Sequence, residues 1–331
     1  MTGNRIRNSM VAIVAAIATW SPQVIAHEAQ QVTVQHEGIV GPLHGTLLAH
    51  LGAENTSAVL IIPGSGPTNR DGNNTLGVRA STYRLLAEAL AKKGISSLRI
   101  DKRGMFASVG AVADANDVTV GEYVADTRAW ISKLREASGQ DCVWLLGHSE
   151  GGLIALATVA ADPSGICGLV MAASPGRPLG MALREQLEAN PANAPILKQA
   201  EAAISALERG EDVSVQDLHP ALLPLFAPQV QGFMRSLLAQ DPGRMLADYK
   251  GPALILQPGE DLQTGLAEGQ ALAAANPAAK LVVLENVNHV LKQVPAEDRA
   301  ANLATYANPD LPLADGVVQA IAEFVLENSS G

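Results

Sequence analysis

The chain has 331 residues, of which 47% are hydrophobic and 3% aromatic, and its formal net charge is −10. This length favours one domain with an insertion, and the composition predicts a large core built from Ala, Val, Leu and Ile. An acidic chain without clusters of basic residues is a poor match for nucleic acids or anionic membrane surfaces. We therefore expect a small-molecule partner and no nucleic acid, while the composition leaves the oligomeric state open.

The first 26 residues have the pattern of an export signal. Two arginines precede an apolar run of 11 residues, Met10–Trp20, and the small residue Ala26 ends the segment. A membrane-spanning helix needs about 20 apolar residues, so an uncleaved anchor is disfavoured. We expect a signal peptide over residues 1–26, cleavage near Ala26, a secreted or periplasmic mature protein and no stable membrane anchor. In that mature chain 21 basic residues face 33 acidic ones, and the formal net charge becomes −12.

After this segment the chain shows two patterns in succession. Two stretches of alternating polar and apolar residues, separated by Gly41 and Pro42, predict an antiparallel hairpin. From Val59 to Ser174, strand-like runs, the first of them continuously apolar, alternate with helical patterns, which predicts an α/β fold with a mostly parallel, doubly wound sheet. The expected strands are the runs in SAVLIIPGSG, ISSLRIDKRG, CVWLLGHS and ICGLVMAAS. The expected helices are STYRLLAEALAKKG, TVGEYVADTRAWISKLREASG and EGGLIALATVAAD.

The alternation stops between Pro175 and about Lys250. This stretch has helical spacing but contains several prolines, so its helices must be short. The strand–helix pattern then resumes with ALILQPG and KLVVLEN and closes with the helix ADGVVQAIAEFVLEN. We therefore predict a core over residues 27–175 and 251–331, with a helical cap or lid inserted over residues 176–250.

Gly147, His148, Ser149, Glu150 and Gly151 form a G-x-S-x-G pattern between an apolar strand and a helix. A serine at such a turn has strained dihedral angles, and the flanking glycines give the turn the room it needs. The turn lifts the hydroxyl above the carboxyl edge of the sheet and aims the amide of Glu150 at a developing oxyanion. The pattern predicts Ser149 as a nucleophile. The alternative is a small-residue turn that only packs a helix against the sheet.

In this kind of fold a serine nucleophile is followed along the chain by an acid and then by a base. Of the seven histidines, four precede Ser149, His148 adjoins it and should point away, and His219 lies in the predicted cap. His289 follows the run KLVVLEN, at the sheet edge where ligands collect. We predict His289 as the base.

The remaining roles are assigned to two loops. The acid should follow the run ALILQ, where Glu260 and Asp261 are both candidates, and we favour Asp261. The second oxyanion donor should lie in PGSGPTNRDGNN, whose glycines permit close backbone approach, and the amide of Ser65, or next that of Gly66, is the expected donor. Four charged residues are expected to brace these loops rather than to touch substrate, namely Arg70, Asp71, Asp101 and Arg103. The sequence contains no metal-ligand cluster, phosphate-binding loop or dinucleotide fingerprint, so we expect neither a metal nor a cofactor.

Two cysteines, Cys142 and Cys167, each begin an apolar run. Neighbouring strands would bring their thiols close together, in a compartment that is oxidising if the chain is exported. A bridge between directly paired strands strains disulfide geometry. A disulfide and two buried, apolar thiols therefore remain alternatives.

The segments PGSGPTNRDGNN, DKRG, GHSEGG, LILQPGEDLQT and NVNHVLK occur in the order and with the spacing seen in α/β-hydrolases of the serine-aminopeptidase-like and carboxylesterase group. The chain resembles this group over essentially all of its length after residue 26, including a helical cap between the sixth and seventh strands. The resemblance implies an α/β-hydrolase fold. Carried over position by position, it implies a triad and two oxyanion-hole amides, namely Ser149, Asp261 and His289, and Ser65 and Glu150. The chain departs from the group in having PGEDLQT for G-x-x-D-L-Q-V and Pro-Gly for His-Gly in the first segment.

The activity that this resemblance implies is hydrolysis of small-to-medium acyl esters through an acyl-serine intermediate, without a cofactor. A serine aminopeptidase or amidase is the first alternative, because it shares the chemistry. A peptidase that binds a free amino terminus needs acids that face the site, and the candidates are Glu150, Glu185, Glu188, Glu201 and Glu208. The second alternative, a non-catalytic binding protein with this fold, is disfavoured by the complete triad.

Overall fold

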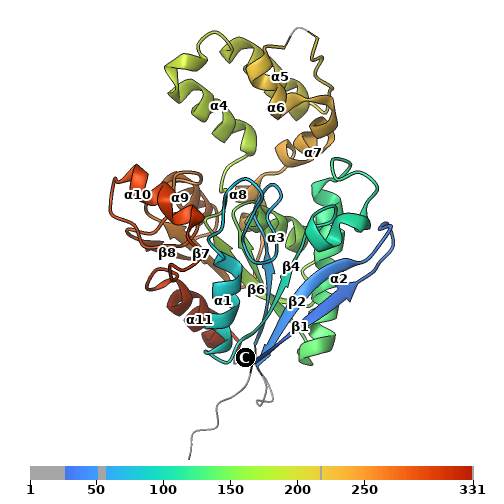
Figure 1. The fold of residues 1–331 in the computed structure, drawn as a ribbon, viewed down its shortest axis with the longest axis vertical. Coiled ribbons are helices and arrows are strands. Elements are labelled where there is room, and N and C mark those ends of the chain that lie inside the picture. Colours follow the sequence, from blue (N-terminus) through green and yellow to red (C-terminus); the bar gives the residue numbers. More distant parts are fainter. Residues whose placement is uncertain (1–26, 51–56, 217, 330–331) are drawn as a thin grey trace, which may run out of the picture.

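A computed structural model describes residues 27–50, 57–216 and 218–329 (Figure 1). The predicted signal peptide, with its cleavage site, lies outside these residues. Eight strands form one sheet in the order β1-β2-β4-β3-β5-β6-β7-β8. In chain order the strands are β1 (His27–Val34), β2 (Leu43–His50), β3 (Ala58–Ile62), β4 (Ser96–Ile100), β5 (Val143–His148), β6 (Ile166–Ala172), β7 (Ala253–Pro258) and β8 (Lys280–Leu284).

The sheet has the mixed topology that the sequence predicts. β1 pairs antiparallel with β2, and β2 pairs antiparallel with β4, whereas all other neighbouring strands are parallel. Every residue of β3, β4, β5 and β7 is buried, which explains why β3, β5 and β7 appear in the sequence as largely apolar runs. β4 is buried too, although its sequence SSLRI includes two serines and an arginine. The predicted α/β fold, with its N-terminal antiparallel hairpin, is confirmed.

Helices cover both faces of the sheet and enclose two apolar clusters. One face is covered by α1 (Thr82–Ala91) and α11 (Val317–Glu327), and the other by α2 (Val120–Ser138), α3 (Glu150–Ala161), α8 (Pro242–Asp248) and α9 (Leu266–Ala275). The helix α10 (Arg299–Ala304) lies in the long connection after β8. The limits of α2 follow from its sequence, because Thr119 and Glu122 form a capping box and Gly139 ends the helix in the left-handed conformation.

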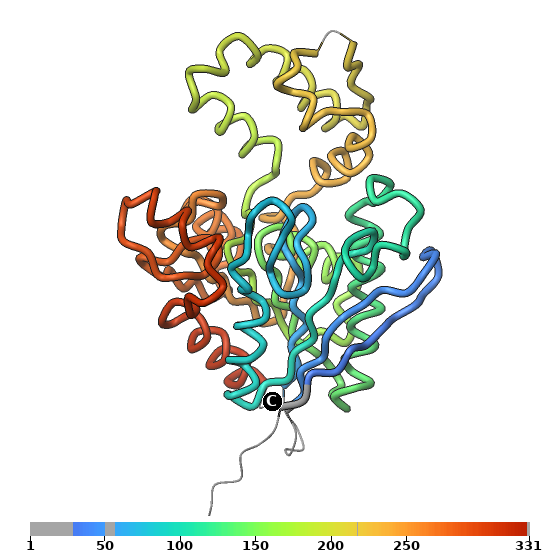
Figure 2. Tube along the Cα trace, in the orientation of Figure 1, coloured from blue at the N-terminus to red at the C-terminus, as the bar shows by residue number. Residues whose placement is uncertain are grey.

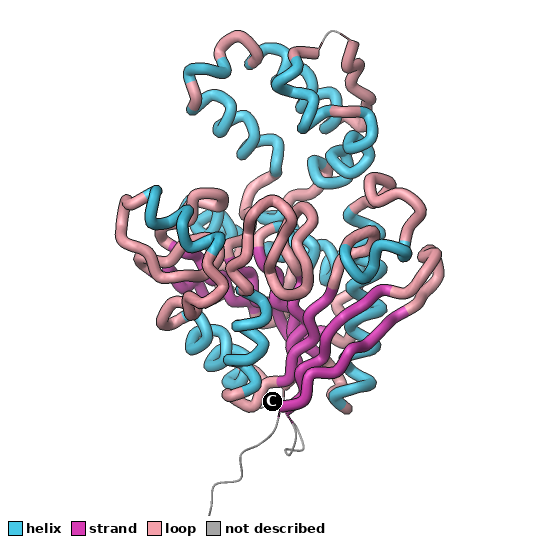
Figure 3. The backbone as a smooth tube through the Cα atoms, in the orientation of Figure 1, coloured by secondary structure: helices cyan, strands magenta, loops and turns pink. Residues whose placement is uncertain are grey.

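Between β6 and β7 the chain leaves the sheet and forms a helical layer, which returns to the core at α8 (Figure 2). The helices of this layer are α4 (Leu179–Ala189), α5 (Leu197–Glu208), α6 (Leu223–Phe226) and α7 (Pro228–Leu238). They share an apolar cluster of their own, which includes the buried Ile204 and Phe226. We call this layer the cap. Figure 3 shows that the loops at one end of the strands lie between the sheet and the cap. The helix α8 packs against α3 and α9 of the core.

Cys142 and Cys167 form a disulfide between the starts of β5 and β6. These strands are directly paired, the arrangement that makes a bridge difficult. Their register, however, shifts between Val143 and Trp144, so that Cys167 lies in a β-bulge outside the regular pairing. The bulge explains how a bridge fits between adjacent strands, with a distance of 5.2 Å between the two Cα atoms.

Candidate active site

Ser149 lies in the tight turn between β5 and α3. Its φ of 55° and ψ of −126° are strained for a residue with a side chain. The neighbouring glycines are required by close contacts: a Cβ atom on Gly147 would overlap the carbonyl oxygen of Gly151, and one on Gly152 would overlap Ser174 Oγ. The structure therefore places the predicted serine on a turn that only this glycine pattern permits.

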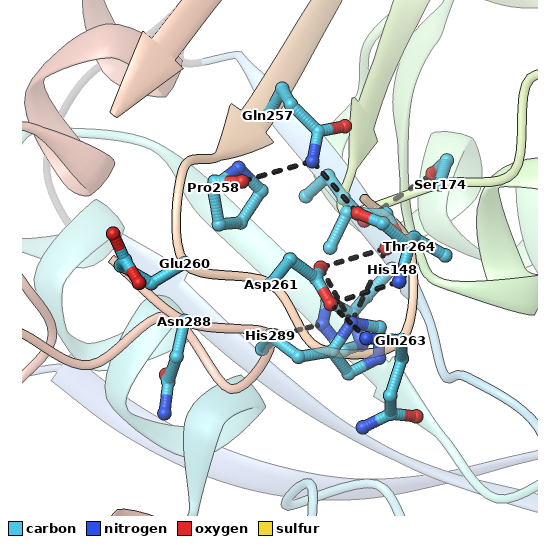
Figure 4. A network of polar contacts seen from close by, with 12 residues as sticks. His148, Ser174, Gln257, Pro258, Glu260, Asp261, Gln263, Thr264, Asn288 and His289 are labelled. Atoms are coloured by element: carbon cyan, nitrogen blue, oxygen red, sulfur yellow. Dashed lines mark hydrogen bonds and ion pairs between the residues drawn. The ribbon is translucent and has the colours of Figure 1, made fainter. Parts of the chain in front are cut away.

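Asp261 and His289, which the sequence predicts as acid and base, are hydrogen-bonded to each other. His289 Nδ1 donates to Asp261 Oδ2 at 2.8 Å, and the same carboxylate accepts from the amides of Gln263 (2.7 Å) and Thr264 (2.9 Å) (Figure 4). Burial raises the pKa of Asp261, but the interactions with His289 and the two amides together outweigh it and hold this pKa below its ordinary value. The carboxylate is therefore ionised and fixes the orientation of the imidazole.

Glu260, the alternative acid, points away from His289 (Figure 4). Its carboxylate accepts a hydrogen bond from the amide of Glu297 at 3.0 Å, and its carbonyl oxygen accepts one from Asn302 at 2.7 Å. The loop that carries both acids is closed by the buried side chain of Gln257, which donates to carbonyl oxygens at either end of it. Asp261 is thus the residue of this pair that the fold turns towards the histidine.

Two cavities meet at Ser149. The smaller one, of about 220 Å³, is lined by Ser149, His289 and the loop after β3, which includes Ser65. The larger one, of about 510 Å³, lies between the core and the cap and is lined by Ser149, Ser65 and Glu150 among others. All five residues that the sequence predicts for the site therefore lie at or directly behind these cavities.

A buried ion pair joins the two segments that are expected to supply oxyanion donors. Lys102 Nζ donates to Gly64 O at 2.7 Å and to a carboxylate oxygen of Glu150 at 3.1 Å. Glu150 is the first residue of α3, so its amide has no acceptor within the helix. Lys102 was not singled out from the sequence, although it lies within the segment DKRG. Its role depends on a contact between residues 48 positions apart, for which the sequence has no local pattern.

The expectation that His148 points away from the site is wrong. Its ring is buried and bridges α1 and the loop of His289: Tyr83 O–H donates to Nδ1 at 2.9 Å, and Nε2–H donates to the carbonyl oxygen of His289 at 2.8 Å. Tyr83 Oη in turn accepts from the amide of Gly64 at 2.9 Å. Because a carbonyl oxygen only accepts, the bond from His148 Nε2 to the carbonyl oxygen of His289 requires the proton on Nε2. Nδ1 is then an acceptor, so the direction of every hydrogen bond in this chain is fixed.

Burial keeps this chain of hydrogen bonds uncharged. It raises the pKa of Tyr83, so the phenol stays protonated and donates. Burial, followed by repulsion from His289, lowers the pKa of His148 to about 3, so this ring stays neutral. A neutral His148 holds the loop of His289 without placing a second positive charge beside it.

The charged residues of the segments PGSGPTNRDGNN and DKRG brace the loops around the site, as predicted. Arg70 donates from its amide (2.8 Å) and Nε (3.0 Å) to the buried Asp101, and Asp71 pairs with Arg99. Arg103 pairs with carboxylates of α2. Within the described ranges no group of His, Cys, Asp and Glu has the arrangement of a metal site, and no helix is long and apolar enough to cross a membrane.

The family model described as "Serine aminopeptidase, S33" matches residues 76–292, which is more than half of the chain. The chain belongs to this family of α/β-hydrolases. No curated protein matches the hydrolase significantly.

Solved structures share the fold of this hydrolase at low sequence identity. Est1E from Butyrivibrio proteoclasticus, solved with ferulic acid bound, has 17% identity and a TM-score of 0.57, and the match covers 91% of this chain and 100% of that one. A thermophilic esterase from Thermogutta terrifontis has 17% identity and a TM-score of 0.55, with 91% and 100% covered. The enol-lactonase from Burkholderia xenovorans LB400 has 19% identity and a TM-score of 0.52, with 89% and 100% covered. These likenesses establish the fold.

The buried His148 predicts a pH dependence of stability. The folded protein holds this ring neutral down to about pH 3, whereas the unfolded chain takes up a proton near pH 6.5, the ordinary pKa. Between these values the unfolded state binds more protons, so the free energy of unfolding falls as the pH falls, by up to about 1.4 kcal/mol per pH unit. We expect the hydrolase with His148→Gln to lose this contribution to the slope, as measured by urea unfolding across this window.

The matched control is His219→Gln, which removes an exposed histidine of the cap and should leave the slope as in the unsubstituted protein. Other titrating groups are common to all three proteins, so they cancel in the comparison. Equal slopes in His148→Gln and the unsubstituted protein would show that His148 is not held neutral by the fold.

Proposed function

We propose that this hydrolase is an exported carboxylesterase that cleaves esters of small-to-medium acyl groups, with Ser149 as nucleophile, His289 as base and Asp261 as acid. The observation that carries the proposal is the convergence at one cavity of a serine on a strained turn and a histidine oriented by a buried carboxylate. The adjoining cavity of about 510 Å³ has the size of small-molecule sites, which is about 300–1,000 Å³.

The proposed reaction has two halves. Ser149 Oγ attacks the ester carbonyl carbon while His289 Nε2 accepts the hydroxyl proton; the bond to the alcohol oxygen then breaks, and that oxygen takes the proton from His289. Water next attacks the acyl-serine, gives a proton to His289 and releases the acid as the proton returns to Ser149. Asp261 stays ionised and stabilises the imidazolium in each half.

The amides of Ser65 and Glu150 are proposed to bind the oxyanion of both tetrahedral intermediates. The amide of Glu150 lies at the N-terminus of α3, a helix of 12 residues whose dipole favours negative charge there. In sites of this kind one donor contributes about 10²–10³-fold to kcat. The buried Lys102, which contacts both donor segments, keeps the two amides in a fixed relation.

The pairing of acids supports an esterase over an aminopeptidase. Among the described residues that line the two cavities, Glu150 is the only carboxylate, and it is paired with Lys102. Glu188 lines a different cavity, on the cap. The other cap acids are paired with arginines: Glu185 with Arg177, and Glu201 and Glu208 with Arg184. Among the described residues that line the two cavities at Ser149, no unpaired carboxylate is therefore present to bind the ammonium group of a peptide.

Export to an oxidising compartment is supported by the disulfide between Cys142 and Cys167, because such bridges persist mainly in secreted and periplasmic proteins. We expect mass spectrometry of the protein recovered from the periplasm or medium to find His27 as the first residue. Intact Met1 in the accumulated protein would contradict cleavage after Ala26.

Hydrolysis of p-nitrophenyl esters of graded acyl length, beside amino-acid p-nitroanilides, tests the proposed chemistry. We expect ester turnover that falls by at least about 10⁴-fold in kcat/KM with Ser149→Ala, because the nucleophile is lost. The matched control is Ser174→Ala, which removes a buried hydroxyl packed against the same turn and should retain most of the activity.

The other outcomes of this assay separate the alternatives. Preferential turnover of the anilides would support the aminopeptidase. An absence of turnover by folded protein would support the non-catalytic binding protein. Ester turnover that survives Ser149→Ala would remove Ser149 from its proposed role.

A further inference from the structure

The two cavities at Ser149 differ in size and in chemistry, and three of the residues that the structure describes line both of them. Ser65, Ser149 and Gln263 belong to both, so the serine and one expected oxyanion donor lie on the boundary between them. A substrate attached to Ser149 therefore has two spaces of different character available, one on each side of its carbonyl carbon.

The larger cavity is suited to an uncharged, apolar group. Six of its lining residues are large apolar side chains from α3 and the cap, namely Leu153, Leu179, Leu183, Leu225, Met234 and Leu237. Its two charged residues are already paired, Glu150 with Lys102 and Arg177 with Glu268 and Glu185. A charged substrate group in this space would lose its hydration without gaining an unpaired partner.

The smaller cavity is more polar, and among the described residues that line it there is no Asp, Glu, Lys or Arg. Tyr306 Oη accepts a hydrogen bond from Gln263 Nε2 at 3.2 Å, so its proton remains available to a substrate oxygen. Burial raises the pKa of Tyr306 to about 12, which keeps the phenol protonated. This space therefore suits a small, uncharged group with a hydrogen-bonding oxygen.

The position of His289 decides which part of an ester enters which cavity. This residue lines the smaller cavity and is not among the residues that line the larger one. The histidine must hand its proton to the alcohol oxygen as the ester bond breaks, and it must activate the water that follows. The leaving group and the water therefore have to lie on the side of the smaller cavity.

We propose that the cavity beneath the cap binds the acyl group and that the cavity beside Tyr306 binds the alcohol, so that the substrates are esters of an apolar, uncharged acid with a small, polar, uncharged alcohol. This assignment rests on the proposed esterase function. It also orders the reaction: the alcohol leaves and water enters through the smaller cavity, while the acyl group stays beneath the cap.

The acyl half of the assignment is tested with Leu183→Trp, which fills part of the larger cavity from α4. The control is Leu187→Trp, one turn further along the same helix, where a half-buried leucine lines a different cavity. With a fixed alcohol, we expect Leu183→Trp to lower the ratio of kcat/KM for octanoyl over acetyl esters by about 10-fold or more, and Leu187→Trp to leave it unchanged. Met234→Trp, from α7, is a second variant should Leu183→Trp not fold, as judged by thermal unfolding.

The alcohol half is tested with Tyr306→Phe, and Tyr249→Phe, at a tyrosine that lines another cavity, is its control. With a fixed acyl group, we expect Tyr306→Phe to lower the ratio of kcat/KM for 2-hydroxyethyl over ethyl esters by about 10-fold. The reason is that the variant loses the hydrogen bond from the Tyr306 hydroxyl to the free hydroxyl of the 2-hydroxyethyl group. Its octanoyl-to-acetyl ratio should not change.

A reversed pattern overturns the assignment. In that case Leu183→Trp would change the ratio for 2-hydroxyethyl over ethyl esters, or Tyr306→Phe would change the ratio for octanoyl over acetyl esters. Unchanged ratios in folded Leu183→Trp, Met234→Trp and Tyr306→Phe overturn it as well. These failures are distinct from failure of the esterase function, which would appear as ester turnover that is absent or independent of Ser149.

Discussion

The backbone of Ser149 is held in a conformation, φ 55° and ψ −126°, that costs about 1–3 kcal/mol and persists only where the surrounding packing enforces it. Here the packing comes from the middle of the sheet. The amide of Ser149 donates to Ala172 O at 2.9 Å, and its carbonyl oxygen accepts from the amide of Gly152 at 2.9 Å. Because β5 and the inner part of β6 are buried, the turn cannot relax without disturbing the core.

A second layer of contacts converts this fixed serine into a complete site. Lys102 ties the loop of Gly64 to the start of α3, and Tyr83 and His148 tie the same loop to the carbonyl oxygen of His289. These contacts cross the sheet edge between loops that follow different strands. The ring of His148 lies 4.8 Å from that of His289, so its neutrality matters: a second charge at this distance would oppose the imidazolium that the mechanism requires.

The parts of this structure that could be predicted from the sequence are those with a local or ordered pattern. Alternating and continuous apolar runs predict the hairpin and the parallel strands, and the glycines around Ser149 predict its turn. The order of Asp261 and His289 after the serine predicts their meeting. The ring direction of His148 and the partner of Lys102 could not be predicted, because each depends on a contact between residues far apart in the chain. The sequence could not decide between a disulfide and two free thiols for a related reason. The bulge that accommodates Cys167 depends on the register of two strands.

The central claim is that Ser149 is a nucleophile activated by a histidine that Asp261 orients. Reaction of the folded protein with a fluorophosphonate, followed by peptide mapping by mass spectrometry, tests it most directly. The account predicts one phosphonyl adduct per chain, on Ser149, formed far more slowly in Asp261→Asn because the imidazole loses its orientation. An adduct on another residue, or an unmodified Ser149 in folded protein, would contradict it.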